Sequence, residues 1–192
     1  MELFLMKKTS LCAVVLLALS AQAMAGSTSL DVTFTATLRE TTCDMAIEGG
    51  TGDGQKNTIP IGAAGKTSLA DISSGADTAS TTFKLKIIEC PSSLAGLKTT
   101  IAGSQSANMV TAIANTASVT PAANMGVSIA RVSAPTAPFT INSTVDAERL
   151  VWTGGEISGQ EVPLIARLVE TKAGEATTGS FSAIATFNFE YQ

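Results

Sequence analysis

The sequence predicts an all-β protein built as an antiparallel sandwich or barrel. Apolar and polar residues alternate, or β-branched residues gather, in a series of short segments along the chain. Clusters of Gly, Ser, Asn, Asp and Pro separate these segments, as in EGGTGDGQKN, SSGADTAS and TGGEISGQ. Short alternating segments divided by turn-forming clusters are typical of antiparallel sandwiches and barrels.

Residues 1–25 have the pattern of a secretory signal peptide. A basic start, Lys7 and Lys8, precedes an apolar run at 11–19 that is too short to span a bilayer. The small residues of AQAMA then lead to an expected cleavage site after Ala25. An uncleaved anchor helix is the weaker alternative, because the run is short and ends in this cleavage pattern. We therefore expect an exported protein.

The 167 residues after the leader are enough for one domain with a sizeable core. They hold 10 of the 12 basic and 15 of the 16 acidic side chains, which gives a net charge of −5. An acidic chain without basic clusters is a poor partner for nucleic acid or for an anionic membrane surface. No later apolar run approaches the length of a transmembrane helix, so we expect no stable membrane insertion.

The expected strands follow one another between the turn clusters. The first, at 30–38, places Leu30, Val32, Phe34, Ala36 and Leu38 on one face and polar residues on the other. An ambiguous segment at 104–120 could hold a strand, a helical turn or both. The remaining strands are expected at 58–62, 82–90, 97–103, 125–132, 161–170 and 181–191.

Two cysteines, Cys43 and Cys90, remain after the leader has been removed with Cys12. An even pair in an oxidising compartment is most simply a disulfide. The closed loop of about 47 residues corresponds to about 4 kcal/mol of stabilisation in the chain-entropy model. A zinc site is not expected, because the chain has no histidine to complete a ligand set.

No catalytic residue, metal site or cofactor is predicted, and we do not expect an enzyme. Without histidine, a serine or cysteine nucleophile has no imidazole base, although a serine–lysine pair remains formally possible. The carboxylate pairs Asp146 with Glu148 and Glu156 with Glu161 lie in polar, turn-like stretches, where solvated loops are the simpler interpretation. Trp152 is either a sugar-stacking side chain or part of the core, and the neighbouring Leu and Val favour the core.

Several motifs, in their order and spacing, resemble the type 1 family of fimbrial (pilin) subunits assembled by the chaperone–usher pathway. VTFTATLRETTC at 32–43 is similar to the amino-terminal extension of that family and its first disulfide cysteine. FKLKIIEC ends at the place of the second cysteine. NMGVSIAR at 124–131, VPLIARLVE at 162–170 and the ending GSFSAIATFNFEYQ, with its penultimate tyrosine, resemble later strands of the family.

This resemblance implies an incomplete immunoglobulin-like antiparallel sandwich that lacks its final strand. The implied organisation is a signal peptide at 1–25, an N-terminal donor-strand extension at 26–40 and a pilin domain at 41–192. The donor strand would carry Leu30, Val32, Phe34, Ala36 and Leu38, and the groove-edge strand that a chaperone contacts would carry Phe187, Phe189 and Tyr191.

The implied function is that of a structural subunit of an adhesive fimbria, polymerised by donor-strand exchange. The implied partners are a periplasmic chaperone, an outer-membrane usher and neighbouring pilin subunits, and the product is an extracellular fimbrium reached through the periplasm. One departure stands out, since Ala36 occupies the position at which the family often has glycine. The alternative is a self-complete secreted β-sandwich that binds a ligand, such as a carbohydrate through Trp152.

Overall fold

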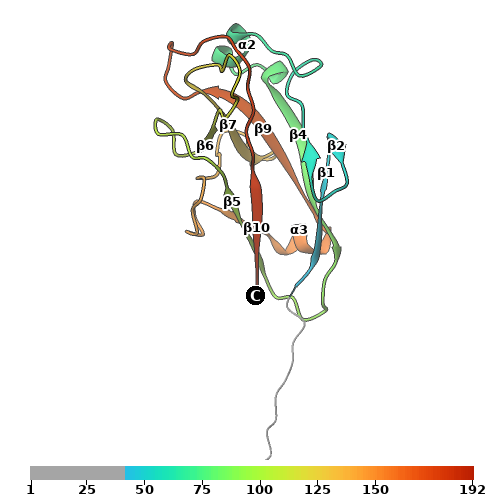
Figure 1. Ribbon diagram of the computed structural model, residues 1–192. Helices are drawn as coiled ribbons and strands as arrows, with labels where there is room; N and C mark the ends of the chain where they lie inside the picture. Colours follow the sequence, from blue (N-terminus) through green and yellow to red (C-terminus); the bar gives the residue numbers. More distant parts are fainter. Residues whose placement is uncertain (1–41) are drawn as a thin grey trace, which may run out of the picture. The chain divides into compact units, whose positions relative to one another are not determined.

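The computed structural model of this chain describes residues 42–192 (Figure 1). The expected signal peptide and the expected donor strand lie outside these residues. Almost all of the regular structure that is described is β, as predicted. Among residues 42–192, no helix has the length and apolar character needed to cross a membrane.

Two antiparallel sheets provide the framework (Figure 1). The larger sheet has the strand order β1-β4-β9-β7-β6, and the smaller sheet has the order β10-β5-β8. A two-stranded hairpin, β2-β3, follows β1. The bounds are β1 (Asp44–Glu48), β2 (Thr51–Gly52), β3 (Asn57–Thr58), β4 (Ser80–Glu89), β5 (Leu97–Ala102), β6 (Ala112–Ala114), β7 (Met125–Arg131), β8 (Leu150–Val151), β9 (Glu161–Glu170) and β10 (Thr186–Tyr191).

The core lies between the inner faces of the strands, where the predicted alternation is observed. In β4, Phe83, Leu85 and Ile87 are buried while the lysines between them stay partly exposed. β9 follows the same rule, and Phe83 is paired with Leu164 across the β4–β9 ladder. A period of two residues therefore separates a buried face from a wet face, as a sheet with one packed side requires.

Trp152 belongs to this core, as its apolar neighbours predicted. Only 4% of its surface is exposed, and its indole Nε1–H donates to the hydroxyl of buried Thr99 at 2.9 Å. A buried tryptophan needs such a partner for its polar atom. The buried ring has no face free to stack on a sugar, so the carbohydrate-binding role of Trp152 is wrong.

Two turn clusters of the sequence contain short helices that we did not predict. α2 (Leu69–Ser74) starts at Ser68, whose hydroxyl accepts the N–H of Asp71, and a 3-10 turn (Asp77–Ala79) follows it. α3 (Gly154–Ser158) starts at Thr153. There, the Thr153 hydroxyl and the Glu156 carboxylate each accept a main-chain N–H of the other residue, which forms a capping box.

The strand expected at 58–62 is wrong in extent, because only Asn57–Thr58 pairs, with Thr51–Gly52. Pro60 has no N–H to donate, and Gly62 has a φ of 85°, so the chain turns instead of continuing a ladder. The ambiguous segment at 104–120 contains one strand, β6, between turns.

The last strand also begins later than predicted, at Thr186 instead of Phe181. Its neighbour β5 ends at Ala102. The carbonyl of Ser104, the next group that would face β10, accepts the N–H of Ala114 at 2.7 Å instead, and the Thr116 N–H donates to the carbonyl of Ser182 at 2.8 Å. The segment around β6 thus takes the hydrogen bonds that would extend the ladder between β5 and β10, which the strand pattern does not reveal.

The predicted disulfide joins Cys43 to Cys90, next to the start of β1 and the end of β4. Replacing both cysteines by alanine is expected to lower the free energy of unfolding of the mature chain by about 4 kcal/mol, because the unfolded chain loses a closed loop. Urea unfolding followed by tryptophan fluorescence measures this. The oxidised wild type treated with a reductant should show the same loss, and a loss below about 1 kcal/mol in both samples would contradict the account.

Candidate strand-binding groove

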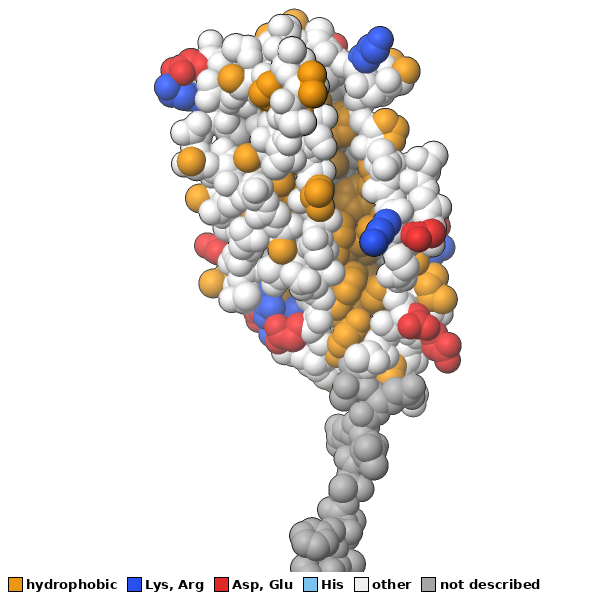
Figure 2. Space-filling model, in the orientation of Figure 1, with side chains coloured by type: hydrophobic (Ala, Val, Ile, Leu, Met, Phe, Trp, Pro, Cys, Tyr) orange, Lys and Arg blue, Asp and Glu red, His pale blue; other side chains and the backbone are white. Residues whose placement is uncertain are grey.

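An apolar hollow runs beside β10 on the face shown in Figure 2. The hydrophobic side chains that are only partly buried against the core come mostly from the last part of the chain and from the segment that includes β1. They include Phe181, Ala183, Ala185, Phe187, Phe189 and Tyr191 near the carboxyl end, and Ile47, Ile59 and Ile61 from the other segment. Half-buried aromatic and branched side chains over a core mark a surface that is suited to be covered.

β10 forms one edge of the smaller sheet, since β5 is its only neighbour among the described strands (Figure 1). Gly96 and Gln192 exchange both of their main-chain hydrogen bonds, at 2.9 and 2.8 Å, and this pair fixes the phase of the ladder. Hydrogen-bonded and non-hydrogen-bonded pairs alternate along an antiparallel ladder. The even-numbered residues of β10 therefore bond to β5.

The odd-numbered residues of β10, Phe187, Phe189 and Tyr191, consequently direct their N–H and C=O groups away from β5. Their side chains are the half-buried ones that pack against the core. Each of these three residues thus offers an apolar side chain to the core and main-chain hydrogen-bonding groups to the open edge. The sequence pattern predicted that these apolar side chains share one face of the strand. Only the register with β5 shows that their main-chain groups face the open edge.

The outer edge of β1 is occupied by local hydrogen bonds. The Ile47 N–H donates to the carbonyl of Gly54 at 2.7 Å, and the Asn57 amide donates to the Ile47 carbonyl at 3.1 Å. The side chain of Gln55 donates to the carbonyl of Met45 at 2.6 Å. The β2–β3 hairpin therefore satisfies this edge, whereas the outward main-chain groups of β10 have no strand beside them among the described residues.

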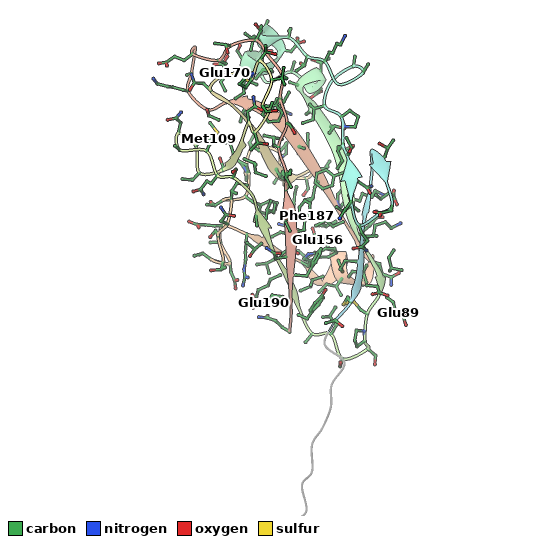
Figure 3. The ribbon with its side chains drawn as sticks, in the orientation of Figure 1. Glu89, Met109, Glu156, Glu170, Phe187 and Glu190 are labelled. Atoms are coloured by element: carbon green, nitrogen blue, oxygen red, sulfur yellow. A yellow bond between two sulfur atoms is a disulfide. The ribbon has the colours of Figure 1, made fainter. Side chains whose placement is uncertain are left out.

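Aromatic contacts hold β10 over the larger sheet. The ring of Phe187 lies 5.9 Å from the ring of buried Phe83 in β4, in a tilted arrangement that aromatic pairs favour. Figure 3 labels Phe187 on β10. At the carboxyl end, the Tyr191 hydroxyl donates to the carbonyl of Cys43 at 3.3 Å, so the disulfide region and the last strand meet there.

The carboxylates considered for catalysis serve structure instead. Asp146 is bonded by Lys98 and Arg149, Glu148 accepts from Ser143, and Glu161 pairs with Lys84. The pKa of Asp146 is lowered by its hydrogen bonds from Lys98 and then from Arg149. Each of these carboxylates therefore has a cationic or hydroxyl partner within the fold.

The Glu156 carboxylate is bonded by both Arg131 and Thr153. Burial raises its pKa, but the Arg131 guanidinium, which donates to both carboxylate oxygens at 2.8 and 3.0 Å, and the Thr153 N–H outweigh burial and lower it. A lowered pKa is unlike that of a general acid, which must hold a proton near neutral pH. Within residues 42–192, no cluster of three or more acidic or cysteine side chains could hold a metal ion.

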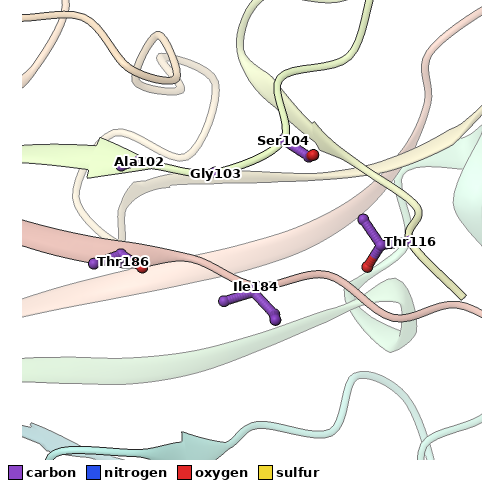
Figure 4. A pocket seen from close by; sticks show the side chains of 6 residues that line it. All are labelled: Ala102, Gly103, Ser104, Thr116, Ile184 and Thr186. Atoms are coloured by element: carbon purple, nitrogen blue, oxygen red, sulfur yellow. The ribbon is translucent and has the colours of Figure 1, made fainter.

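A shallow pocket of about 350 Å³ lies beside the start of β10 (Figure 4). Ala102, Gly103 and Ser104 line it at the end of β5, Thr116 lines it after β6, and Ile184 and Thr186 line it from the last segment. This pocket lies where the ladder between β5 and β10 stops and Ser104 bonds to Ala114 instead. Its lining has no ionisable side chain, so it offers no acid, base or metal ligand.

Glu156→Gln is expected to lower the free energy of unfolding by about 1–2 kcal/mol at pH 7, because the ion pair to Arg131 is lost while glutamine can still close the capping box. Since folding lowers this pKa, the wild type has the full contribution above the ordinary value of 4.5 and loses it as the pH falls through the folded value. Urea unfolding at pH 7 and at pH 3.5 should show the difference shrinking on acidification. Glu161→Gln, which breaks a more exposed pair, is the control, and an equal effect of both variants would refute the assignment.

The comparisons with known proteins agree with this geometry. A family model described as fimbrial protein matches residues 32–192. An uncharacterized fimbrial-like protein of Escherichia coli (strain K12), YadM, is 30% identical over 174 residues, which cover 86% of this chain and 88% of the relative. The P pilus rod subunit PapA has a similar fold in its crystal structure, with a TM-score of 0.55 and 18% identity over 84% of this chain and 100% of that one. Matched over almost all of its length beyond the expected leader, this chain belongs to the fimbrial protein family.

Proposed function

We propose that this subunit polymerises by donor-strand exchange, in which the apolar hollow beside β10 receives residues 30–38 of a neighbouring copy or of a related subunit. The observation that carries the proposal is the phase of the β10 ladder. Phe187, Phe189 and Tyr191 present main-chain groups to an edge that no described strand occupies. Strand addition to such an edge takes its affinity from the main chain and its specificity from alternate side chains.

The incoming segment has the pattern that the hollow requires. Leu30, Val32, Phe34, Ala36 and Leu38 share one face of an extended strand. Burying its four large members at about 1.5–3 kcal/mol each gives on the order of 6–12 kcal/mol before ordering costs. A slip of one residue would instead direct Asp31 and the threonines into the hollow, so the register is well specified.

Before assembly, the same edge would be the contact for a periplasmic chaperone, and an outer-membrane usher would carry the subunit to the surface. An uncovered apolar edge is an aggregation hazard, so a temporary strand from another protein gives the subunit a soluble form. Adhesion is then the contribution of the assembled extracellular fibre. The organisation that goes with this proposal is a leader at 1–25, a donor extension at 26–40 and a pilin domain at 41–192.

The first test is the binding of a synthetic peptide, residues 27–40, to the mature chain. The amides of Phe187, Phe189 and Tyr191 should gain protection from hydrogen exchange when the peptide binds, because the added strand bonds these residues. The amides of Asn188 and Glu190 should already be protected by β5 in the free chain. Exchange measured residue by residue with NMR shows this alternation. An equal gain in protection at odd and even amides on peptide binding, or no gain at the odd ones, would refute strand addition at β10.

A second test uses substitutions on the two faces of the donor. Phe34→Asp in the peptide should weaken binding by roughly a hundredfold or more, because a charge would enter an apolar hollow. Thr35→Asp adds the same charge on the opposite face and should change the affinity little. Isothermal titration calorimetry measures both. A comparable loss with the two peptides would show that the donor does not bind as an alternating strand.

Deletions separate the proposal from the self-complete sandwich. Removing residues 26–40 should leave a chain that still folds with a chaperone but no longer forms fibres. If this deletion abolishes folding and the peptide fails to bind, residues 30–38 are an ordinary strand of their own domain. Removing residues 187–192 should abolish capture by the chaperone, and normal capture would contradict the docking role of β10. No observation favours the carbohydrate-binding alternative, since Trp152 is buried.

A further inference from the structure

Arg149 is the only charged residue among those described that is buried, with 7% of its surface exposed. A buried guanidinium requires hydrogen-bonded partners of opposite charge. Arg149 donates to Asp146 through Nε at 2.9 Å and Nη2 at 2.7 Å, and to Glu190 through Nη1 at 2.7 Å. Glu190 belongs to β10, and Figure 3 labels it near the carboxyl end of that strand.

This arrangement crosses the smaller sheet. Arg149 directly precedes β8, Glu190 lies in β10, and β5 runs between these two strands. Lys98 of β5 joins the cluster through an ion pair with Asp146 at 2.9 Å. All three strands of the sheet are therefore connected by side-chain charges as well as by their ladders. Two cations and two carboxylates face one another, so the cluster is neutral overall.

The cluster fixes β10 at the place where the strand has support on one side only. Glu190 and Tyr191 are consecutive, so their side chains lie on opposite faces of β10. Tyr191 bonds to the Cys43 carbonyl on the core side, while Glu190 is held by Arg149 on the other. Odd-numbered residues can offer their main-chain groups to an incoming strand only if β10 keeps its twist and position.

We propose that Arg149 is a positioning residue, which keeps β10 in place for the addition of a strand at its open edge. Acid would weaken this contact by protonating the carboxylates that Arg149 binds. The inference rests on the proposed function of the groove. The charged groups that face Arg149 are Asp146 of its own loop and Glu190 of β10, and Lys98 of β5 faces Asp146. Protonation of the two carboxylates would leave the buried guanidinium without charged partners.

The sign of the pH effect follows from these contacts. The hydrogen bond from Arg149 lowers the pKa of Glu190, and the hydrogen bonds from Lys98 and Arg149 lower that of Asp146. Both carboxylates therefore remain ionised above their ordinary values of 4.5 and 3.8, where the hold is complete. The hold weakens only as the pH falls through the lowered values.

The test compares the mature wild-type chain with Glu190→Gln, a substitution that preserves shape and removes the charge. At pH 7 the variant should bind the peptide 27–40 roughly three- to tenfold more weakly, because one charge-assisted hydrogen bond at a partly exposed site is lost. Between pH 7 and pH 3.5 the wild-type affinity should fall more steeply than that of the variant. Protonation of the peptide's own side chains affects both affinities equally, because both proteins bind the same peptide.

Glu161→Gln serves as the control, because it breaks an ion pair with Lys84 on the larger sheet and should keep the wild-type pH profile. The second readout needs no peptide, since the β5-bonded amides of Asn188 and Glu190 should exchange faster in Glu190→Gln at pH 7. Identical pH profiles together with unchanged amide exchange would overturn the role of Arg149. If the peptide fails to bind the wild type but these amides still exchange faster, the groove proposal fails while the hold on β10 stands.

Discussion

The open edge of β10 is the constraint around which the rest of this structure is arranged. A strand with a neighbour on one side leaves half of its main-chain groups without ladder partners, and the core beneath it is only half covered. The large sheet, the disulfide and the packing of Trp152 give this incomplete layer a rigid support. The subunit is thus well packed on the side of the larger sheet and unfinished along one edge of the smaller one.

Polar side chains satisfy main-chain groups at several other places along the described sheets. Gln55 and Asn57 bond the outer main-chain groups of β1, and Asn142 bonds both main-chain groups of Gly103 after β5. Glu156 and Arg131 fasten α3 near β7. These contacts explain why carboxylates that resemble catalytic pairs in the sequence are used as structural partners in the fold. A polar side chain that completes a sheet edge is not available to a substrate.

The charged cluster around Arg149 bears on the position of this edge strand. The main chain of β10 provides the surface for an added strand, and the charged cluster on its opposite face provides the position. A fibre joined by strand addition depends on both, because an edge that shifts by a fraction of the strand spacing loses several hydrogen bonds together. The ion cluster around buried Arg149 would thus serve assembly as well as stability.

The sequence by itself determined the features that depend on local pattern. Alternation in 82–90 and 161–170 gave two central strands almost to the residue, the cysteine count gave the disulfide, and the neighbours of Trp152 placed it in the core. The capping pattern at Thr153 and Glu156 was also present in the sequence, but it lay inside a glycine-rich cluster that we assigned to a turn.

Tertiary structure alone decided what is not local. The β5 register sets which residues of β10 face the open edge. Arg149 meets Glu190 across 41 residues of chain, and neither position has a pattern that predicts the other. Periodicity fixes which face of a strand is apolar, because it depends on the residue's own backbone. The direction of the hydrogen bonds and the choice of ionic partners depend on which distant strand lies alongside, and only the folded chain shows that.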